Sequence, residues 1–135
     1  MSSLVKISES TFAAIHSVVY LVKEKRVVKI GELSSMTGSS IPVLSKVLQY
    51  LTKRGIIESI RGPQGGFIFS KDPSKVNLLE IFQIMEGPIE KNVCPFNKKK
   101  CHFKRCVFDN VVKKINKEFL DYLEKTTVAE LAKKI

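Results

Sequence analysis

The sequence predicts a mainly α-helical chain with one small β-hairpin, and three observations lead to this prediction. Residues 41–53 carry apolar side chains at the i, i+3, i+4, i+7 spacing of one helical face. Two short strand-like stretches follow directly, with a glycine-rich turn between them. A second apolar stripe of helical spacing occupies residues 107–124. A helix followed at once by a hairpin indicates a winged helix-turn-helix domain, to which a long helix is appended.

The helix at 41–53 has clear start and stop signals. A serine of the preceding turn can cap its amino end, Pro42 is tolerated in its first turn, and Gly55 stops it. Its inward face consists of Leu44, Val47, Leu48 and Leu51. Its outer face is cationic or hydrogen-bonding and free to contact a partner; it carries Val43, Ser45, Lys46, Gln49, Tyr50 and Lys53.

The hairpin is predicted from residues 56–60 and 67–70. The sequence between them, Arg61-Gly-Pro-Gln-Gly-Gly, has glycines that allow positive φ and a proline that fixes a turn. An arginine at such a tip suits a narrow minor groove of high negative potential. We expect Arg61 to enter that groove, with Gln64 and the amides of Gly65 and Gly66 at phosphates.

The segments before this unit complete a helix-turn-helix. Residues 8–25 predict a first helix, capped by Ser8 or Ser10, with a broad apolar stripe of Phe12, Ile15, Val18, Val19 and Val22. Val27-Val28 is a candidate short strand. Residues 30–37 predict a second helix whose inward positions are Ile30, Leu33 and Met36, followed by the turn Gly38-Ser39-Ser40.

After the hairpin, Asn77 and Glu80 resemble a capping box for a fourth helix at 78–86, and Gly87-Pro88 ends this module. We therefore expect three parts. Residues 1–87 form the winged helix-turn-helix DNA-binding domain, residues 88–106 a cysteine-rich, cluster-binding loop, and residues 107–135 a dimerisation helix with a short last helix at 127–134.

Composition favours a polyanionic partner. The 135 residues include 23 Lys and Arg against 13 Asp and Glu, which gives a net charge of +10. This balance favours nucleic acid or an anionic membrane surface, although solubility alone also explains it. No apolar run approaches the roughly 20 residues of a membrane span, and the polar first residues are not a signal peptide. We expect a cytoplasmic protein.

In a helix-turn-helix, the second helix enters the major groove and its first residues reach base edges. Lys46 can donate to guanine or phosphate, Gln49 can pair with adenine, and Val43 can touch a thymine methyl. The alternative is that these residues are only the solvated side of an amphipathic helix. The predicted DNA-binding set is Ser39, Ser40, Pro42, Val43, Ser45, Lys46, Gln49, Tyr50, Lys53, Arg61, Gln64 and Gly65.

All three cysteines lie close together, at Cys94, Cys101 and Cys106. An odd number in a reducing compartment argues against a disulfide framework and for metal ligation or redox chemistry. The gaps, six residues and then four, are wider than the paired spacing of zinc ribbons and fit a loop around something larger than one ion. Six basic residues from Lys91 to Arg105 would offset a cluster's negative charge. The alternative is three incidental free thiols.

The stripe at 107–124 has no obvious partner within a domain whose core is already filled. A long apolar helix appended to a DNA reader usually pairs with its copy, so we infer a homodimer. The alternative is that the helix packs on its own domain, and both arrangements can hold in part. The predicted dimerisation residues are Phe108, Val111, Val112, Ile115, Phe119 and Leu123.

The chain resembles the Rrf-two (Rrf2) family of bacterial winged-helix regulators, in its cluster-binding branch. The resemblance rests on the helix at 41–53, the wing from Ile60 to Phe67, Leu79-Glu80-Ile81, and three cysteines before a long helix. It implies a dimer joined by that helix. It also implies Cys94, Cys101 and Cys106 as three ligands of an iron–sulfur cluster, either [2Fe–2S] or [4Fe–4S].

Departures from the family pattern leave the fourth ligand open. Asp109 stands where cluster regulators have a histidine, and Thr11 stands where nitric-oxide sensors have a first-helix aspartate from the partner subunit. The candidates are Asp109, His102, a first-helix residue such as Glu9, or an exogenous molecule. Ser45 replaces a glutamate that discriminates between operators, so the operator is expected to differ.

Our leading hypothesis is a dimeric, sequence-specific regulator that binds a double-stranded DNA operator and senses iron, oxygen or nitric oxide through a cluster. The first alternative keeps the DNA reader but places structural zinc, or a thiol redox switch, at the same cysteines. The second is a winged helix used for protein–protein contact. Catalysis is not expected, because the sequence lacks a Ser/His/Asp constellation, a phosphate loop and paired carboxylates.

Overall fold

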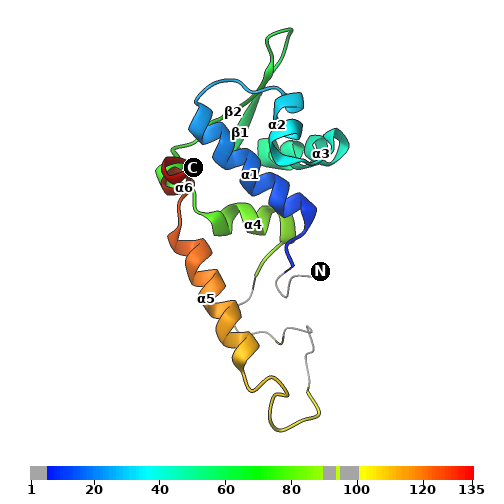
Figure 1. The fold of residues 1–135 in the computed structure, drawn as a ribbon, viewed down its shortest axis with the longest axis vertical. Coiled ribbons are helices and arrows are strands. Elements are labelled where there is room, and N and C mark those ends of the chain that lie inside the picture. Colours follow the sequence, from blue (N-terminus) through cyan, green and yellow to red (C-terminus); the bar gives the residue numbers. More distant parts are fainter. Residues whose placement is uncertain (1–5, 90–93, 95–100) are drawn as a thin grey trace.

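The computed structural model describes residues 6–89, 94 and 101–135. The expected cysteine-rich loop lies partly outside the described residues, at 90–93 and 95–100, with Lys91 and Lys98–Lys100 of its basic set. The helices and strands, in chain order, are α1 (Glu9–Glu24), α2 (Ile30–Thr37), α3 (Ile41–Lys53), β1 (Ile57–Ile60), β2 (Gly66–Phe69), the 3-10 turn η1 (Pro73–Lys75), α4 (Leu78–Glu86), α5 (Val111–Lys125) and α6 (Val128–Lys134). In Figure 1 the β-hairpin projects at one end and α5 extends at the other.

The fold class is confirmed as helical with one antiparallel hairpin, and α3 has the predicted bounds. The Ser40 hydroxyl caps α3 by accepting the Val43 N–H at 3.4 Å. Gly55 then takes φ 73°, a left-handed conformation that costs glycine little. Local capping chemistry therefore sets both ends of α3.

Helix α1 buries small residues where it crosses its neighbours. Ala13 and Ala14 are fully buried, and α1 packs against α3, α4 and α6 (Figure 1). Two inward positions were predicted wrongly. Phe12 is 41% exposed and stacks on His16, with ring centroids 3.9 Å apart, and Met36 of α2 is 38% exposed. Other predicted inward positions, such as Val18 and Leu33, are buried, so Phe12 and Met36 lie outside the buried face of their helices.

The hairpin is extended by a third piece of chain. β1 and β2 pair with Ser59 opposite Phe67 and Ile60 opposite Gly66. Phe67 also pairs with Val28, which confirms an extended segment at Val27-Val28. Gly66 is required by this packing, since a Cβ on it would lie 2.4 Å from the Val28 carbonyl oxygen.

The carboxyl-terminal segment returns to the first part of the chain. The Leu78 N–H donates to the Thr126 carbonyl oxygen and the Val128 N–H to the Val76 carbonyl oxygen, each at 3.0 Å. Helix α5 starts at Val111, four residues later than predicted, because the preceding two residues, Asp109 and Asn110, take positive φ. α6 begins one residue after the predicted start and packs on α1.

One hydrophobic core joins all these helices and the base of the hairpin. It includes Leu21 of α1, Leu33 of α2, Leu48 of α3 and Ile81 of α4. Leu123 and Val128, from the carboxyl-terminal helices, belong to the same cluster. Burial of these side chains stabilises the fold and fixes the direction in which α3 and the hairpin face outward.

Candidate nucleic-acid interface and cysteine segment

The outer surface of α3 has two flanks. Ser45, Gln49 and Lys53 follow one another at intervals of four and form the flank toward the hairpin, where they line a common groove. Lys46 and Tyr50 form the other flank, toward α1 and α4. Pro42 and Ser40 are exposed at the amino end, whereas Val43 is half-buried against the core. Apart from Val43, these predicted contacts are accessible.

Ser39 was predicted to contact DNA, but it is buried in the turn before α3. It is only 3% exposed, its N–H donates to the Thr37 hydroxyl oxygen at 3.1 Å, and its carbonyl oxygen accepts the Ser34 hydroxyl at 2.8 Å. Both contacts lie within the turn between α2 and α3. Ser39 therefore orients the two helices and does not offer its side chain to the outer surface.

The tip of the hairpin presents its cation. Arg61 and Gln64 are exposed. Within the tip, the Gly65 N–H donates to the Gly62 carbonyl oxygen at 2.9 Å. This amide is therefore not free to contact a phosphate, and the contact predicted for it is wrong. The Lys29 ammonium donates to the Pro63 carbonyl oxygen at 3.1 Å and ties the tip to the base of α2.

A polar network joins α1 to α2, and sequence reasoning missed it. Glu32 accepts the Tyr20 hydroxyl at 2.5 Å and the Arg26 guanidinium at 2.6 Å. These bonds lower the pKa of Glu32, with Arg26 the larger cause, and the bond to Glu32 raises the pKa of Tyr20 to about 12. The network holds α2, and thereby the helix-turn-helix, against the end of α1.

A second cluster ties the start of α1 to the end of α4. The Glu86 carboxylate accepts the Ser8 and the Thr11 hydroxyls, both at 2.6 Å. These two bonds, that from Ser8 first, lower the pKa of Glu86. Thr11 is fully buried, so its hydroxyl serves this contact. Glu86 is the last residue of α4, directly before the chain leaves toward the cysteines.

The three cysteines are free thiols; Cys101 is exposed, and Cys94 and Cys106 are half-buried. Within the described residues, no group of three His, Cys, Asp or Glu side chains lies together in a way that holds a metal ion. The backbone N–H groups of Phe108 and, next, Asn110 lower the pKa of the Cys106 thiol. Asp109 pairs with Arg105 at 2.7 Å, and His102 is exposed.

The chemistry of this donor set fits a soft metal or an iron–sulfur cluster, since thiolates are the ligands these groups prefer. The arrangement of the described side chains does not bring three donors to one centre. The cysteines therefore supply suitable ligands, and the described part of this segment displays no preformed site.

The apolar side chains of helix α5 are mainly buried in its last turns and mainly exposed in its first turns. Its last turns pack inward through Leu120 and Leu123, and Phe119 meets Phe82 edge to face, with centroids 6.0 Å apart. Its first turns present apolar side chains to the outside; Val111 is 51% and Ile115 52% exposed, and Val112 is half-buried, while Phe108, which precedes the helix, is 43% exposed. Leu123, predicted at a dimer interface, instead lies in the core of its own chain, 2% exposed.

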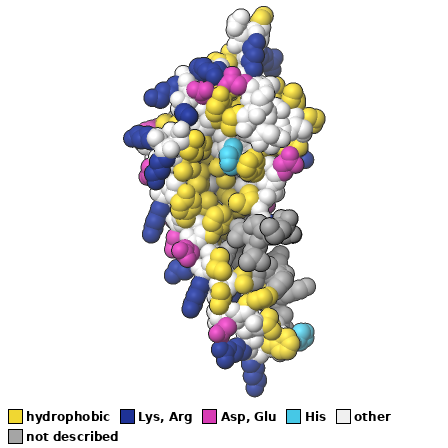
Figure 2. All heavy atoms as spheres, in the orientation of Figure 1, with side chains coloured by type: hydrophobic (Ala, Val, Ile, Leu, Met, Phe, Trp, Pro, Cys, Tyr) yellow, Lys and Arg dark blue, Asp and Glu magenta, His cyan; other side chains and the backbone are white. Residues whose placement is uncertain are grey.

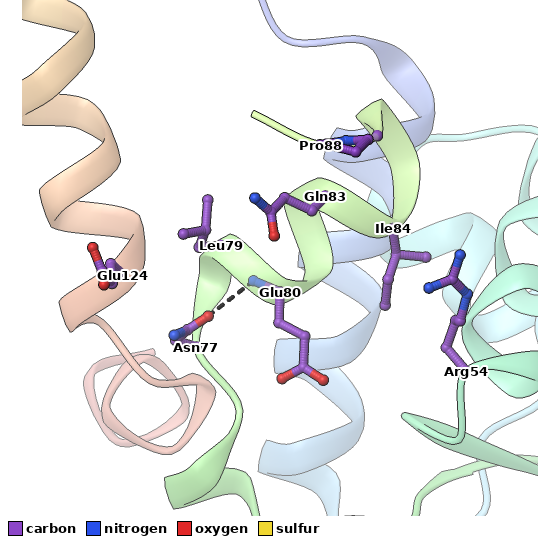
Figure 3. Close-up of a pocket in the computed structure, with 9 residues that line it drawn as sticks. Arg54, Asn77, Leu79, Glu80, Gln83, Ile84, Pro88 and Glu124 are labelled. Atoms are coloured by element: carbon purple, nitrogen blue, oxygen red, sulfur yellow. Dashed lines mark hydrogen bonds between the residues drawn. The ribbon is translucent and has the colours of Figure 1, made fainter. Parts of the chain in front are cut away.

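Two hollows follow α4 on the side away from the hairpin, and both contain carboxylates. The larger, about 650 Å³, lies between α3, α4 and α5, with Arg54 and Glu80 on one side and Glu124 on the other (Figure 3). The smaller, about 420 Å³, contains Glu86 beside Lys46. These carboxylates make the α4 side of α3 less suited to a polyanion than the hairpin side.

Known proteins resemble this chain over almost its whole length. The sequence profile of the Rrf2 family, described as iron-dependent transcriptional regulators, matches residues 7–134. A protein of Aquifex aeolicus, provisionally assigned as an HTH-type transcriptional regulator, is 27% identical over 92% of this chain and 89% of its own. The HTH-type transcriptional regulator IscR of Serratia proteamaculans is 25% identical over 84% of this chain and 69% of its own.

Solved structures share the fold. CymR, the global cysteine regulator of B. subtilis, superposes with a TM-score of 0.78 at 21% identity, covering 98% of this chain and 99% of its own. IscR of T. potens superposes with a TM-score of 0.74 at 23% identity, covering 97% and 88%. None of the described helices is both long and apolar enough to span a membrane.

Proposed function

The chain belongs to the Rrf2 family of DNA-binding transcriptional regulators, and on this premise we propose a dimeric, sequence-specific operator-binding protein that is controlled by an iron–sulfur cluster at Cys94, Cys101 and Cys106. The family is one of regulators and not of enzymes. We place its action in the cytoplasm. The observation that carries the DNA-binding part is the groove that Ser45, Gln49 and Lys53 of α3 share with the hairpin, whose tip presents the exposed Arg61.

The contacts of α3 and the hairpin support sequence-specific reading. The turn at Ser39 and the Tyr20–Glu32–Arg26 network fix the angle of α3, and Lys29 fixes the hairpin tip. Binding then requires little ordering of these parts, which favours affinity. Lys46 and Gln49 have the donors and acceptors that base edges require, and Arg61 suits the adjacent minor groove.

The exposed face of α5 supports a homodimer. Figure 2 shows apolar side chains continuing from α1 over α4 to α5 on one face of the molecule. The exposed apolar side chains of α1, of α5 and of the residues just before α5 include Phe12, Phe108, Val111, Ile115 and Tyr122, each at least 41% exposed. Contiguous apolar surface of this kind marks an interaction site, and a second copy would cover it while bringing two α3 helices to one operator.

The position of Glu86 supports coupling between the cysteines and the DNA-binding elements. Cys94 follows eight residues after Glu86, whose carboxylate is tied to Ser8 and Thr11 of α1. An iron–sulfur cluster, when bound, supplies redox chemistry and ligand exchange that respond to iron, oxygen or nitric oxide. The chain's part is to hold Glu86 against α1 in one state and release it in another, with α1 packed directly on α3.

The test combines a spectrum with a binding measurement. Protein purified without oxygen should absorb between about 320 and 420 nm and contain iron and sulfide, and the C94S/C101S/C106S variant should lack both. A duplex selected from a random pool with the loaded protein should then bind that variant with changed affinity. Unchanged affinity despite complete loss of the cluster would reject cluster control and leave DNA binding intact.

A second candidate is zinc, or a thiol redox switch, at the same cysteines. The free state of the three cysteines supports a thiol switch, and their soft thiolates also suit zinc. Zinc is colourless, so a zinc stoichiometry of one without the visible band supports this alternative. Operator-independent binding with little salt dependence would instead point to a protein–protein contact module, because a reader of many phosphates loses affinity steeply with salt.

A further inference from the structure

A groove of about 310 Å³ separates the recognition helix α3 from the hairpin. Gln49 and Lys53 form its helix wall, and Ser59 and Phe67 form its hairpin wall. Ile30, at the start of α2, is half-buried at the same groove. The groove therefore has an apolar part, formed by Ile30 and Phe67, and a polar rim.

The strand register determines which hairpin side chains face this groove. Ser59 lies opposite Phe67 in the ladder, and it shares a face of β1 with Ile57, which is buried in the core. Glu58 alternates to the opposite face. The one carboxylate of β1 therefore points away from the groove, and the Ser59 hydroxyl points toward it.

Charge sets this groove apart from the hollows along α4. Its lining contains the cation of Lys53 and no carboxylate. The hollows on the other flank of α3 combine a cation with carboxylates, Lys46 with Glu86 in one case and Arg54 with Glu80 and Glu124 in the other (Figure 3). A chain of negative charges is therefore favoured more in the groove on the hairpin side, which has a cation and no carboxylate, than in the hollows along α4, where carboxylates offset the cations.

We infer that this groove receives one sugar–phosphate strand of the DNA duplex, with a phosphate at Lys53 and Ser59 and the deoxyribose against Ile30 and Phe67. The inference rests on the proposed DNA-binding function. When α3 lies in the major groove and Arg61 in the adjacent minor groove, one backbone strand must pass between them. Phosphate contacts of this type carry no sequence information and fix the register of the protein on the duplex.

This assignment gives Ser59 a role that its polarity alone does not reveal. The hydroxyl holds the strand at a fixed position between the base contacts of α3 and the tip arginine. The spacing of the major-groove and minor-groove contacts on DNA then follows from the width of the groove, which the Val28–Phe67 pairing sets.

The experiment moves one carboxylate across β1 without changing the net charge. The double variant E58S/S59E is compared with Glu58→Ser alone by fluorescence anisotropy, on a 30-bp duplex selected with the wild-type protein and on an unselected duplex of equal length. Because the carboxylate would face a phosphate, the double variant should bind both duplexes at least about tenfold more weakly, while Glu58→Ser binds as wild type does. Circular dichroism establishes that both variants are folded.

A second variant provides an independent measure. Lys53→Gln should lower the slope of log affinity against log salt by about one, with the ranking of the two duplexes retained. Wild-type affinity in E58S/S59E together with an unchanged slope in Lys53→Gln would overturn the inference and leave the DNA-binding function standing. Failure of the wild type to bind either duplex would overturn both.

Discussion

Val28 and Phe67 exchange two backbone hydrogen bonds, each 2.8 Å between nitrogen and oxygen. Val28 precedes α2 and Phe67 lies in β2, so this exchange fastens the base of the hairpin to the helix-turn-helix. The recognition helix and the hairpin tip therefore move as one unit. A DNA reader with two contact points requires such rigidity, because loss of it would add an ordering cost to binding.

Gly66→Ala should separate the hairpin from the helix-turn-helix. The added Cβ would lie 2.4 Å from the Val28 carbonyl oxygen, so the pairing must shift, at a cost of about 1–3 kcal/mol. Thermal unfolding followed by circular dichroism should show a lower midpoint, and affinity for the selected duplex should fall. Gly31→Ala is the control: that position has no neighbour within 4 Å and lies in a helix, so stability should hold or rise.

Substitutions of Ser40 should distinguish its cap from its DNA contact. Ser40→Ala removes the acceptor for the Val43 N–H and should destabilise the protein by about 1 kcal/mol. Ser40→Asp keeps an acceptor and places a negative charge at a helix amino end, which preserves stability. That charge would nevertheless repel DNA, so affinity should fall further for Ser40→Asp than for Ser40→Ala. Equal affinities for the two variants would remove Ser40 from the interface.

Stability in acid should depend on Glu86. Its pKa is below the ordinary value of 4.5, so its contribution to stability is complete above that pH and is lost as the pH falls through the folded-state pKa. The difference in unfolding midpoint between wild type and Glu86→Gln should therefore shrink from pH 6 toward pH 3. Thr11→Val, which removes one of the two hydroxyl donors, should weaken the same pH dependence. A difference that stays constant over this range would contradict the assignment.

Ile115→Glu should dissociate the proposed dimer. Ile115 is 52% exposed, so a carboxylate there costs the folded chain little but would be buried against a partner helix. Sedimentation velocity should give a dimer for wild type and a monomer for this variant. Lys117→Glu, on another side of α5, serves as the control and should remain dimeric. A wild-type monomer at micromolar concentration would reject the dimer itself.

The sequence determined most element boundaries because capping is local. A serine of the preceding turn, Pro42 and Gly55 predicted both ends of α3, and Asn77 predicted the start of α4, where its side chain accepts the Glu80 N–H. The start of α5 was missed because Asp109 and Asn110 take positive φ, which short polar residues tolerate without requiring it. Phe12 and Met36 were misplaced because the spacing of apolar residues does not show where the buried face of a helix ends.

The candidate site was less predictable, because it depends on pairings between distant residues. The Val28–Phe67 exchange and the Glu86 cluster join positions more than thirty residues apart in sequence, and no local pattern indicates them. Glu24 and Glu32, which lie near Tyr20 and Arg26 in the sequence, are a weak signal for the α1–α2 network. Cysteine spacing predicts ligand chemistry but not whether the three sulfurs meet.

The most direct test of the account is the affinity of Arg61→Ala for selected duplexes with A·T-rich or G·C-rich flanks, measured by anisotropy at several salt concentrations. Wild type should prefer A·T-rich flanks, bind more weakly as salt rises, and lose that flank preference together with affinity when Arg61 is removed. Wild-type affinity and flank preference in Arg61→Ala, with binding indifferent to salt, would contradict a DNA reader built from α3 and the hairpin.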